Sequence, residues 1–184
     1  MKKLFMIAAL MVVTLSANAQ GMFIKPMVGA TLSSFVGDFT EDEKYKVGLV
    51  AGAEFGYFFN ENMGVTAGLL YTMQGSKDKN AEYNENLDYL NIPILFNYYI
   101  FPGFAVKAGI QPGFLVRAKY DDESLKDFYK STDFAIPMGV SYEFSDFVID
   151  ARYNLGVANI LEHSGDYKQR NSVFQLTLGY KIPF

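Results

Sequence analysis

Apolar and polar side chains alternate with a period of two along most of the chain after residue 20. The C-terminal segment shows this most clearly, because apolar residues on one face (Phe174, Leu176, Leu178, Tyr180, Ile182 and Phe184) alternate with Gln175, Thr177, Gly179, Lys181 and Pro183. Seven earlier segments alternate in the same way, at residues 24–32, 45–57, 63–74, 90–98, 104–117, 134–144 and 147–158. A period of two is that of a β-strand with two unlike faces. The pattern therefore predicts an all-β fold of eight strands.

The connections between these segments alternate in length. Polar stretches near residues 37–44, 75–86, 121–133 and 162–171 are long, whereas Asn60-Glu61-Asn62, Phe101-Pro102-Gly103 and Ser145-Asp146 are short. Bacterial outer-membrane barrels combine long extracellular loops with short periplasmic turns in this order. The spacing therefore predicts an antiparallel up-and-down barrel with both ends of the chain on the periplasmic side.

The polar face of the strands indicates which side of the barrel is inside. Apart from a few single charges, it carries mostly Gly, Ala, Ser, Thr, Asn and Gln. This set is too small and too weakly charged for the water-exposed wall of a soluble barrel such as a lipocalin. It suits a narrow lumen, which leaves the apolar face for lipid. We therefore expect a transmembrane barrel rather than a soluble one.

The first residues have the three parts of a secretory signal peptide. Lys2 and Lys3 precede an apolar stretch from Leu4 to Leu15, and the segment closes with an Ala-x-Ala sequence. The apolar stretch is shorter than the roughly 20 residues that a membrane-spanning helix needs. We expect cleavage between Ala19 and Gln20, with a signal peptide at 1–19 and a barrel domain at 20–184.

Composition excludes several classes of function. The formal net charge is −4, so the chain lacks the basic surface that neutralises nucleic-acid phosphates. It contains no cysteine and one histidine, and no zinc-ligand cluster, calcium-loop spacing or phosphate-binding glycine motif. We expect no cofactor, no metal site and no nucleic-acid partner.

Three segments also carry a family resemblance: Leu87 to Leu95, Asp133 to Val140 and Arg152 to Ile160. With the terminal Phe184, they resemble the outer-membrane β-barrel family typical of the Bacteroidetes, often labelled porin-family or PorT-like. The resemblance covers nearly the whole mature chain and implies a location in the outer membrane. It does not imply an activity, although a few members are accessory to protein secretion.

Eight charged residues fall on the predicted inner face of the strands: Lys25, Glu54, Lys107, Arg117, Glu143, Asp150, Arg152 and Lys181. An eight-stranded barrel has room for side chains and little else, and opposite charges buried there are expected to pair. We favour a structural plug of ion pairs. A gated path for ions or small solutes is the alternative.

The last long loop contains a weak candidate for catalysis. His163 and Ser164 adjoin, with Glu162 and Asp166 nearby, and some barrel enzymes modify lipids with such residues. Adjacency alone does not provide the geometry that a nucleophile, base and orienting carboxylate need. We therefore expect a protein that is not an enzyme, with a lipid-modifying activity as a further alternative.

Partners follow from the predicted location. We expect contact with outer-membrane lipid, with lipopolysaccharide and with the barrel assembly machinery, which can pair with a free C-terminal strand by strand addition. Tyr180, Ile182 and Phe184 share one face of that strand and form the predicted assembly signal. The expected role is structural or one of surface interaction through the extracellular loops.

Overall fold

The computed structural model describes residues 21–38, 43–78, 84–120, 123–124, 128–162 and 167–184. The predicted signal peptide and the cleavage position at Ala19 and Gln20 lie outside the described residues and stay predictions. His163, Ser164 and Asp166 also lie outside them. No helix in the described part of the chain is long and apolar enough to cross a membrane.

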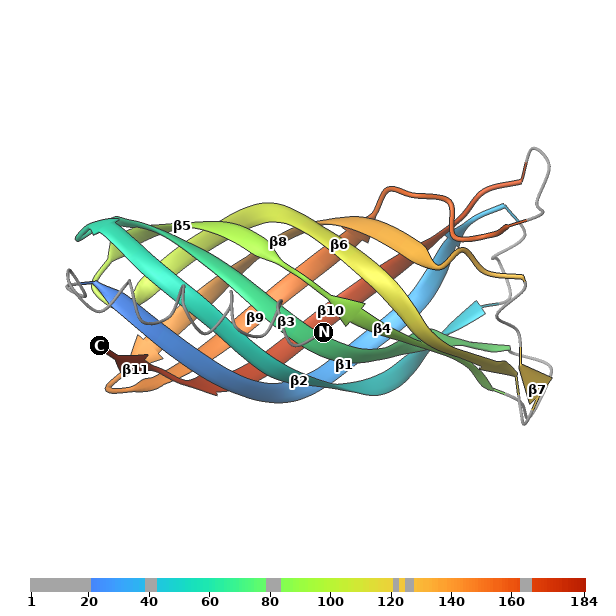
Figure 1. Ribbon diagram of the computed structural model, residues 1–184, viewed down its shortest axis with the longest axis horizontal. Coiled ribbons are helices and arrows are strands. Elements are labelled where there is room, and N and C mark those ends of the chain that lie inside the picture. Colours follow the sequence, from blue (N-terminus) through green and yellow to red (C-terminus); the bar gives the residue numbers. More distant parts are fainter. Residues whose placement is uncertain (1–20, 39–42, 79–83, 121–122, 125–127, 163–166) are drawn as a thin grey trace, which may run out of the picture.

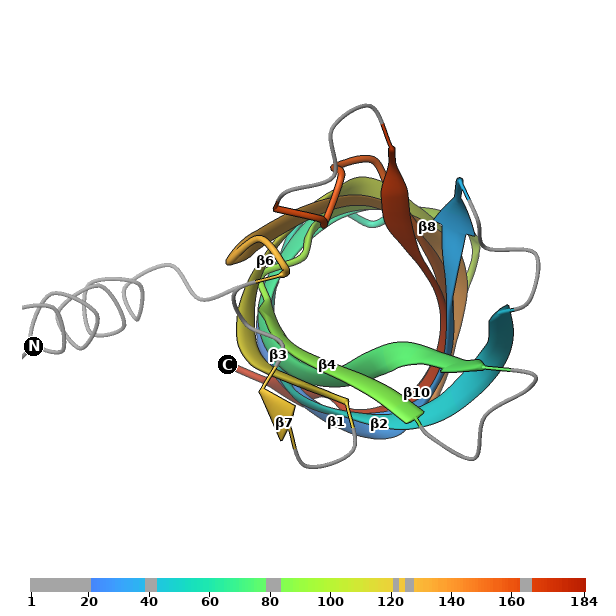
Figure 2. The same cartoon turned by 90° about the vertical axis from the view of Figure 1, so that its right-hand side faces the viewer.

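In the described part of the chain, eleven strand segments form one antiparallel sheet that closes on itself (Figures 1 and 2). The segments are β1 (Met22–Gly37), β2 (Glu43–Asn60), β3 (Met63–Asp78), β4 (Asn84–Asn91), β5 (Ile94–Phe101), β6 (Phe104–Tyr120), β7 (Glu123–Ser124), β8 (Thr132–Phe144), β9 (Phe147–Gly156), β10 (Gln169–Tyr180) and β11 (Ile182–Pro183). β4 and β5 form one wall strand interrupted at Ile92-Pro93, β10 and β11 form another, and β7 is a short addition beside β6. The wall therefore has the eight strands that were predicted.

Pairing between the first and last strands closes the ring. β1 pairs antiparallel with β10 from Met27↔Gly179 to Gly37↔Gln169, and with β11 at Phe23↔Pro183 and Ile24↔Ile182. A closed ring leaves no sheet edge in the membrane, where an unpaired backbone group is costly. The predicted eight-stranded antiparallel transmembrane barrel is confirmed.

The two faces of the wall differ as the alternation predicted. Val28, Leu49 and Leu69 are each more than half exposed on the outside, whereas Thr31 and Gln175 are buried inside the barrel. Nearly all the large exposed hydrophobic residues lie on the wall strands, which gives the barrel an apolar outer belt. An apolar surface of this extent is typical of contact with lipid, because its exposure to water is energetically unfavourable.

The two ends of the barrel are built differently (Figure 1). Three tight turns and the C-terminus gather at one end, which by the usual barrel orientation is periplasmic. Pro102-Gly103 makes one of these turns, and Gly103 has a φ of 85°, as the third position of a type II turn requires. At the other end, strands run further than predicted: β3 continues to Asp78 and β4 starts at Asn84, within a stretch expected to be loop.

Candidate functional site in the barrel lumen

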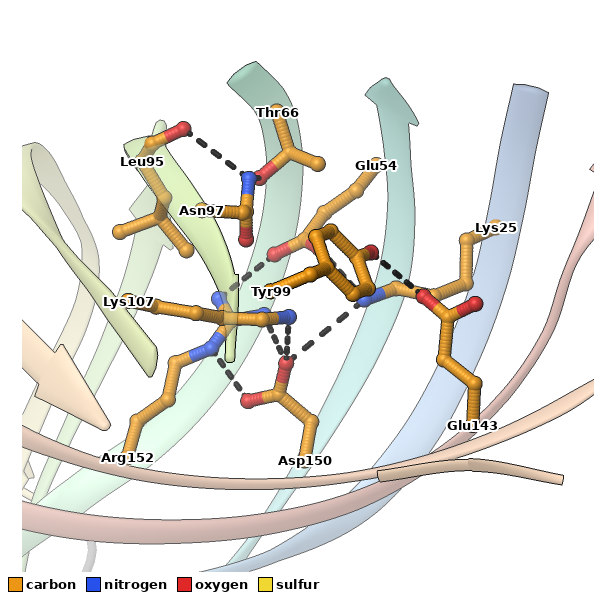
Figure 3. Close-up of polar contacts among 10 residues, drawn as sticks. All are labelled: Lys25, Glu54, Thr66, Leu95, Asn97, Tyr99, Lys107, Glu143, Asp150 and Arg152. Atoms are coloured by element: carbon orange, nitrogen blue, oxygen red, sulfur yellow. Dashed lines mark hydrogen bonds and ion pairs between the residues drawn. The ribbon is translucent and has the colours of Figure 1, made fainter. Parts of the chain in front are cut away.

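Five charged side chains from four strands meet inside the periplasmic half of the barrel (Figure 3). Lys25 of β1 is the direct cross-strand partner of Glu54 on β2. Lys107 comes from β6, and Asp150 and Arg152 are two residues apart on β9, so both point inward. We call these five residues the lumen network.

Short ion pairs connect every member of the lumen network. Arg152 contacts both carboxylates, with its Nη1 2.5 Å from Glu54 Oε1 and its Nε 2.5 Å from Asp150 Oδ1. Lys107 Nζ lies 2.5 Å from Asp150 Oδ2. Lys25 Nζ lies 2.8 Å from Glu54 Oε2 and 3.7 Å from Asp150 Oδ2. Three of these pairs, Lys107–Asp150, Arg152–Glu54 and Lys25–Asp150, join strands that are not neighbours in the sheet, so they connect opposite parts of the wall across the lumen.

The lumen network contains three cations and two carboxylates, all almost completely buried. Removing a charge from water costs several kcal/mol, and only close opposite charges offset that cost. Asp150 accepts contacts from all three cations, which makes it the central member of the network. Each carboxylate of the lumen network therefore has at least two cations within ion-pair distance.

Glu143 and Lys181 form a second group nearer the periplasmic end. Lys181 Nζ lies 2.7 Å from Glu143 Oε2, and the Tyr99 hydroxyl donates a 2.6 Å hydrogen bond to Glu143 Oε1. The ammonium of Lys181 also lies 4.5 Å from the ring centroid of Phe58 and 4.8 Å from that of Phe23. A cation above aromatic faces is attracted by the ring quadrupoles. This group caps the periplasmic side of the lumen network.

Two aromatic residues near strand ends, Phe58 and Tyr99, pack inside the barrel. Phe58 and Tyr99 cluster near strand ends, and such positions suggest rings at the membrane interface. Tyr99 is only 9% exposed and points inward, and Phe58 packs against it with ring centroids 5.3 Å apart. The alternation itself contains the signal that would have found them, because both residues fall between outward-facing neighbours.

The structure does not bring Arg117 into the lumen, contrary to the prediction. The pairing of β4 with β6 shifts register between Asp88↔Arg117 and Tyr89↔Leu115, so Val116 is an extra residue in β6. Such a β-bulge reverses the side-chain alternation beyond it. Arg117 therefore lies outside, with a side chain that is 51% exposed. The other seven predicted residues lie inside the barrel.

On the extracellular side of the lumen network, neutral polar side chains fill the lumen. Asn91 Nδ2 and Gln74 Nε2 both donate to Thr72 Oγ1, at 2.6 and 2.8 Å. Towards the extracellular end, six buried residues then form an apolar cluster: Phe35, Leu87, Tyr89, Ala118, Tyr129 and Ile160. We call this set the mouth cluster.

Loop segments complete the mouth cluster. Tyr129 and Ile160 come from the connections before β8 and after β9, and the Lys130 amide donates to the Ile160 carbonyl at 2.7 Å. The rings of Phe35 and Tyr129 stack with centroids 6.5 Å apart. The alternation pattern does not predict this cluster, because its members are separated by up to 125 residues and all six lie outside the predicted strand segments.

Among the described residues, no group of His, Cys, Asp or Glu side chains is arranged to hold a metal.

Comparison with known proteins supports this architecture. Residues 5–181 match the family model described as the outer membrane protein beta-barrel domain. The chain belongs to this family. The location of a member is the outer membrane, and the inverted barrel described above fits that location. No curated protein has a matching sequence.

Solved structures of similar fold include two bacterial surface proteins. The attachment invasion locus protein Ail of Yersinia pestis is 20% identical, with a TM-score of 0.55 over 88% of this chain and 99% of Ail. Neisserial surface protein A (NspA) is 16% identical, with a TM-score of 0.57 over 89% of this chain and 97% of NspA. At these identities the likeness shows a common fold.

Proposed function

We propose that this protein is a non-conducting, non-enzymatic barrel that presents its extracellular loops for contact with other molecules at the cell surface. The observation that carries the proposal is the lumen network, in which every carboxylate is ion-paired at 2.8 Å or less. A water-filled path would need these pairs to separate. The mouth cluster adds an apolar layer above them, where hydrated ions would lose their water.

The length of the strands supports a role outside the membrane. β2 has 18 residues and β6 has 17, whereas a tilted strand needs about 9–11 residues to cross a bilayer. The surplus lies at the extracellular end, since the opposite end has only tight turns (Figure 1). The extracellular strand ends are therefore raised above the lipid, which suits contact between the connections that they carry and a partner. The names of Ail and NspA describe attachment and the cell surface, which is consistent with such a role here.

The resemblance of residues 87–95, 133–140 and 152–160 further supports placing the chain in the branch typical of the Bacteroidetes. Within that branch, some members are accessory to secretion, and we do not extend that role to this chain. The barrel assembly machinery and lipopolysaccharide remain its proposed partners.

Two measurements test the proposal. In planar bilayers, the purified protein is expected to give no stable conductance, and large, long-lived openings would contradict the closed lumen. In a non-adherent bacterial host, its expression is expected to raise adhesion to cultured epithelial cells. Trypsin treatment of the intact cells is expected to cut between residues 121 and 131 and to remove that adhesion. Resistance of the loops to trypsin in intact cells, or adhesion that survives their cleavage, would contradict a role for the loops.

A further inference from the structure

The bulge in β6 places a buried carboxylate and two basic residues on the lipid-facing side of the barrel. Asp88 faces outward from β4, between inward-facing Leu87 and Tyr89, and its side chain is only 3% exposed. Its direct partner across the strand pair is Arg117. Lys119 follows Arg117 on the same face of β6, because Ala118 between them is buried inside.

Asp88 is held in place from the neighbouring strand. The Tyr71 hydroxyl of β3 donates a 2.6 Å hydrogen bond to Asp88 Oδ2, the same oxygen that Arg117 approaches. Arg117 Nη1 is 3.8 Å from that oxygen, which is ion-pair distance but too long for a hydrogen bond. Among the described residues, Asp88 is the only carboxylate within ion-pair distance of Arg117. The guanidinium is thus oriented by a fixed charge while its N–H donors remain available.

The position of Arg117 along the barrel indicates its surroundings. Phe114 and Val116 precede it on the outer wall and are 45% and 41% exposed, as lipid-facing residues are. Beyond it, β6 continues only to Tyr120 before the extracellular connection. Arg117 and Lys119 therefore lie where the apolar belt ends on the extracellular side, at the headgroup level of the outer leaflet.

We infer that Arg117, oriented by Asp88 and Tyr71 and assisted by Lys119, binds a phosphate group of the glycolipid in the outer leaflet, lipopolysaccharide. Arginine presents a planar fork of N–H donors that matches a phosphate in a bidentate way. A phosphomonoester carries more negative charge than the phosphodiester of an ordinary phospholipid, so the two neighbouring cations favour the glycolipid. In the opposite orientation, Arg117 would lie at the level of the apolar mouth cluster, beside Leu87 and Tyr89, where a buried charge is costly.

Native mass spectrometry of the detergent-solubilised protein with monophosphoryl lipid A tests this inference. Arg117→Gln is expected to weaken lipid A binding roughly tenfold or more, because it removes the charge-assisted hydrogen bonds between the guanidinium and the phosphate. Lipid A without its phosphate is expected to bind the wild type as weakly as lipid A binds the variant. Arg117→Lys keeps the charge without the fork and is expected to fall between the two.

Arg170→Gln is the matched control, because Arg170 is also exposed near the extracellular end of a wall strand. It is expected to change lipid A binding less than twofold. Equal binding by wild type and Arg117→Gln would overturn the inference, and so would an equal loss in both arginine variants, which would indicate general charge attraction. Phosphatidylglycerol is a further arm: wild-type binding as strong as that of lipid A would overturn the assignment to the glycolipid. Heat-modifiability on gels verifies that each variant is folded.

Discussion

Replacing Asp150 with asparagine removes the acceptor shared by all three cations of the lumen network. Lys107 then has no carboxylate within ion-pair distance among the described residues, because its pair is with Asp150 at 2.5 Å. The network changes from three cations and two carboxylates to three cations and one. Leaving a buried charge without its partner costs about 3–5 kcal/mol. We therefore expect Asp150→Asn to lower the free energy of unfolding by about that amount.

Lys25→Met is the matched variant within the same network. Without Lys25, two cations face two carboxylates, and Glu54 and Asp150 both keep a contact with Arg152 at 2.5 Å. Because Lys25 is the surplus cation, its removal leaves no buried charge without an opposite partner, so the penalty for an uncompensated buried charge does not arise. We expect a loss of about 1 kcal/mol or less.

Urea titration of the barrel in detergent micelles measures both values. The chain has no tryptophan, so unfolding is followed by circular dichroism and by gel mobility. Stability of Asp150→Asn equal to that of the wild type would refute the reasoning. An equal loss in Lys25→Met would also refute it, because the charge balance would then have no influence.

Three further variants test other parts of the barrel. In Gly109→Ala, the new Cβ would clash with the Ile94 carbonyl oxygen, so we expect a loss of about 1–3 kcal/mol and a lower urea midpoint. An unchanged midpoint would contradict this close packing of β5 against β6. Ile160→Ala opens a cavity in the mouth cluster at a cost of about 2–5 kcal/mol. We therefore expect trypsin to cleave the folded barrel faster near residues 128–131. An unchanged rate of digestion would show that the mouth cluster does not hold this connection in place. Deleting Phe184 is expected to reduce insertion into the outer membrane, and an unchanged heat-modifiable band would contradict its role in assembly.

Much of the wall was predictable because each strand has one lipid face and one lumen face. The alternation of Phe174 to Tyr180 and of Phe147 to Gly156 recurs in the burial of those strands. The charges that lie on undisturbed alternation, such as Glu54 and Asp150, also lie inside as expected. A local pattern therefore predicts local orientation.

Arg117 shows where the local pattern fails. Nothing in its own segment marks Val116 as an extra residue, because a bulge depends on how β6 pairs with β4. The mouth cluster could not be predicted for a related reason, because Phe35 and Tyr129 come into contact only when the barrel has closed. The ion-pair partners in the lumen could not be predicted from the sequence either, because they depend on the tilt and register of all the strands.

The orientation of the wall is tested most directly by site-directed spin labelling in lipid bilayers. The chain has no cysteine, so single cysteines at Ile94, Phe96 and Tyr98 and at Leu95 and Asn97 can each be labelled without interference. We predict high collision rates with oxygen, which dissolves in lipid, at the first three positions and low rates at the other two. Equal rates at all five positions, or high oxygen access at Leu95 and Asn97 instead, would contradict a barrel with its apolar face in lipid and a packed, charged lumen.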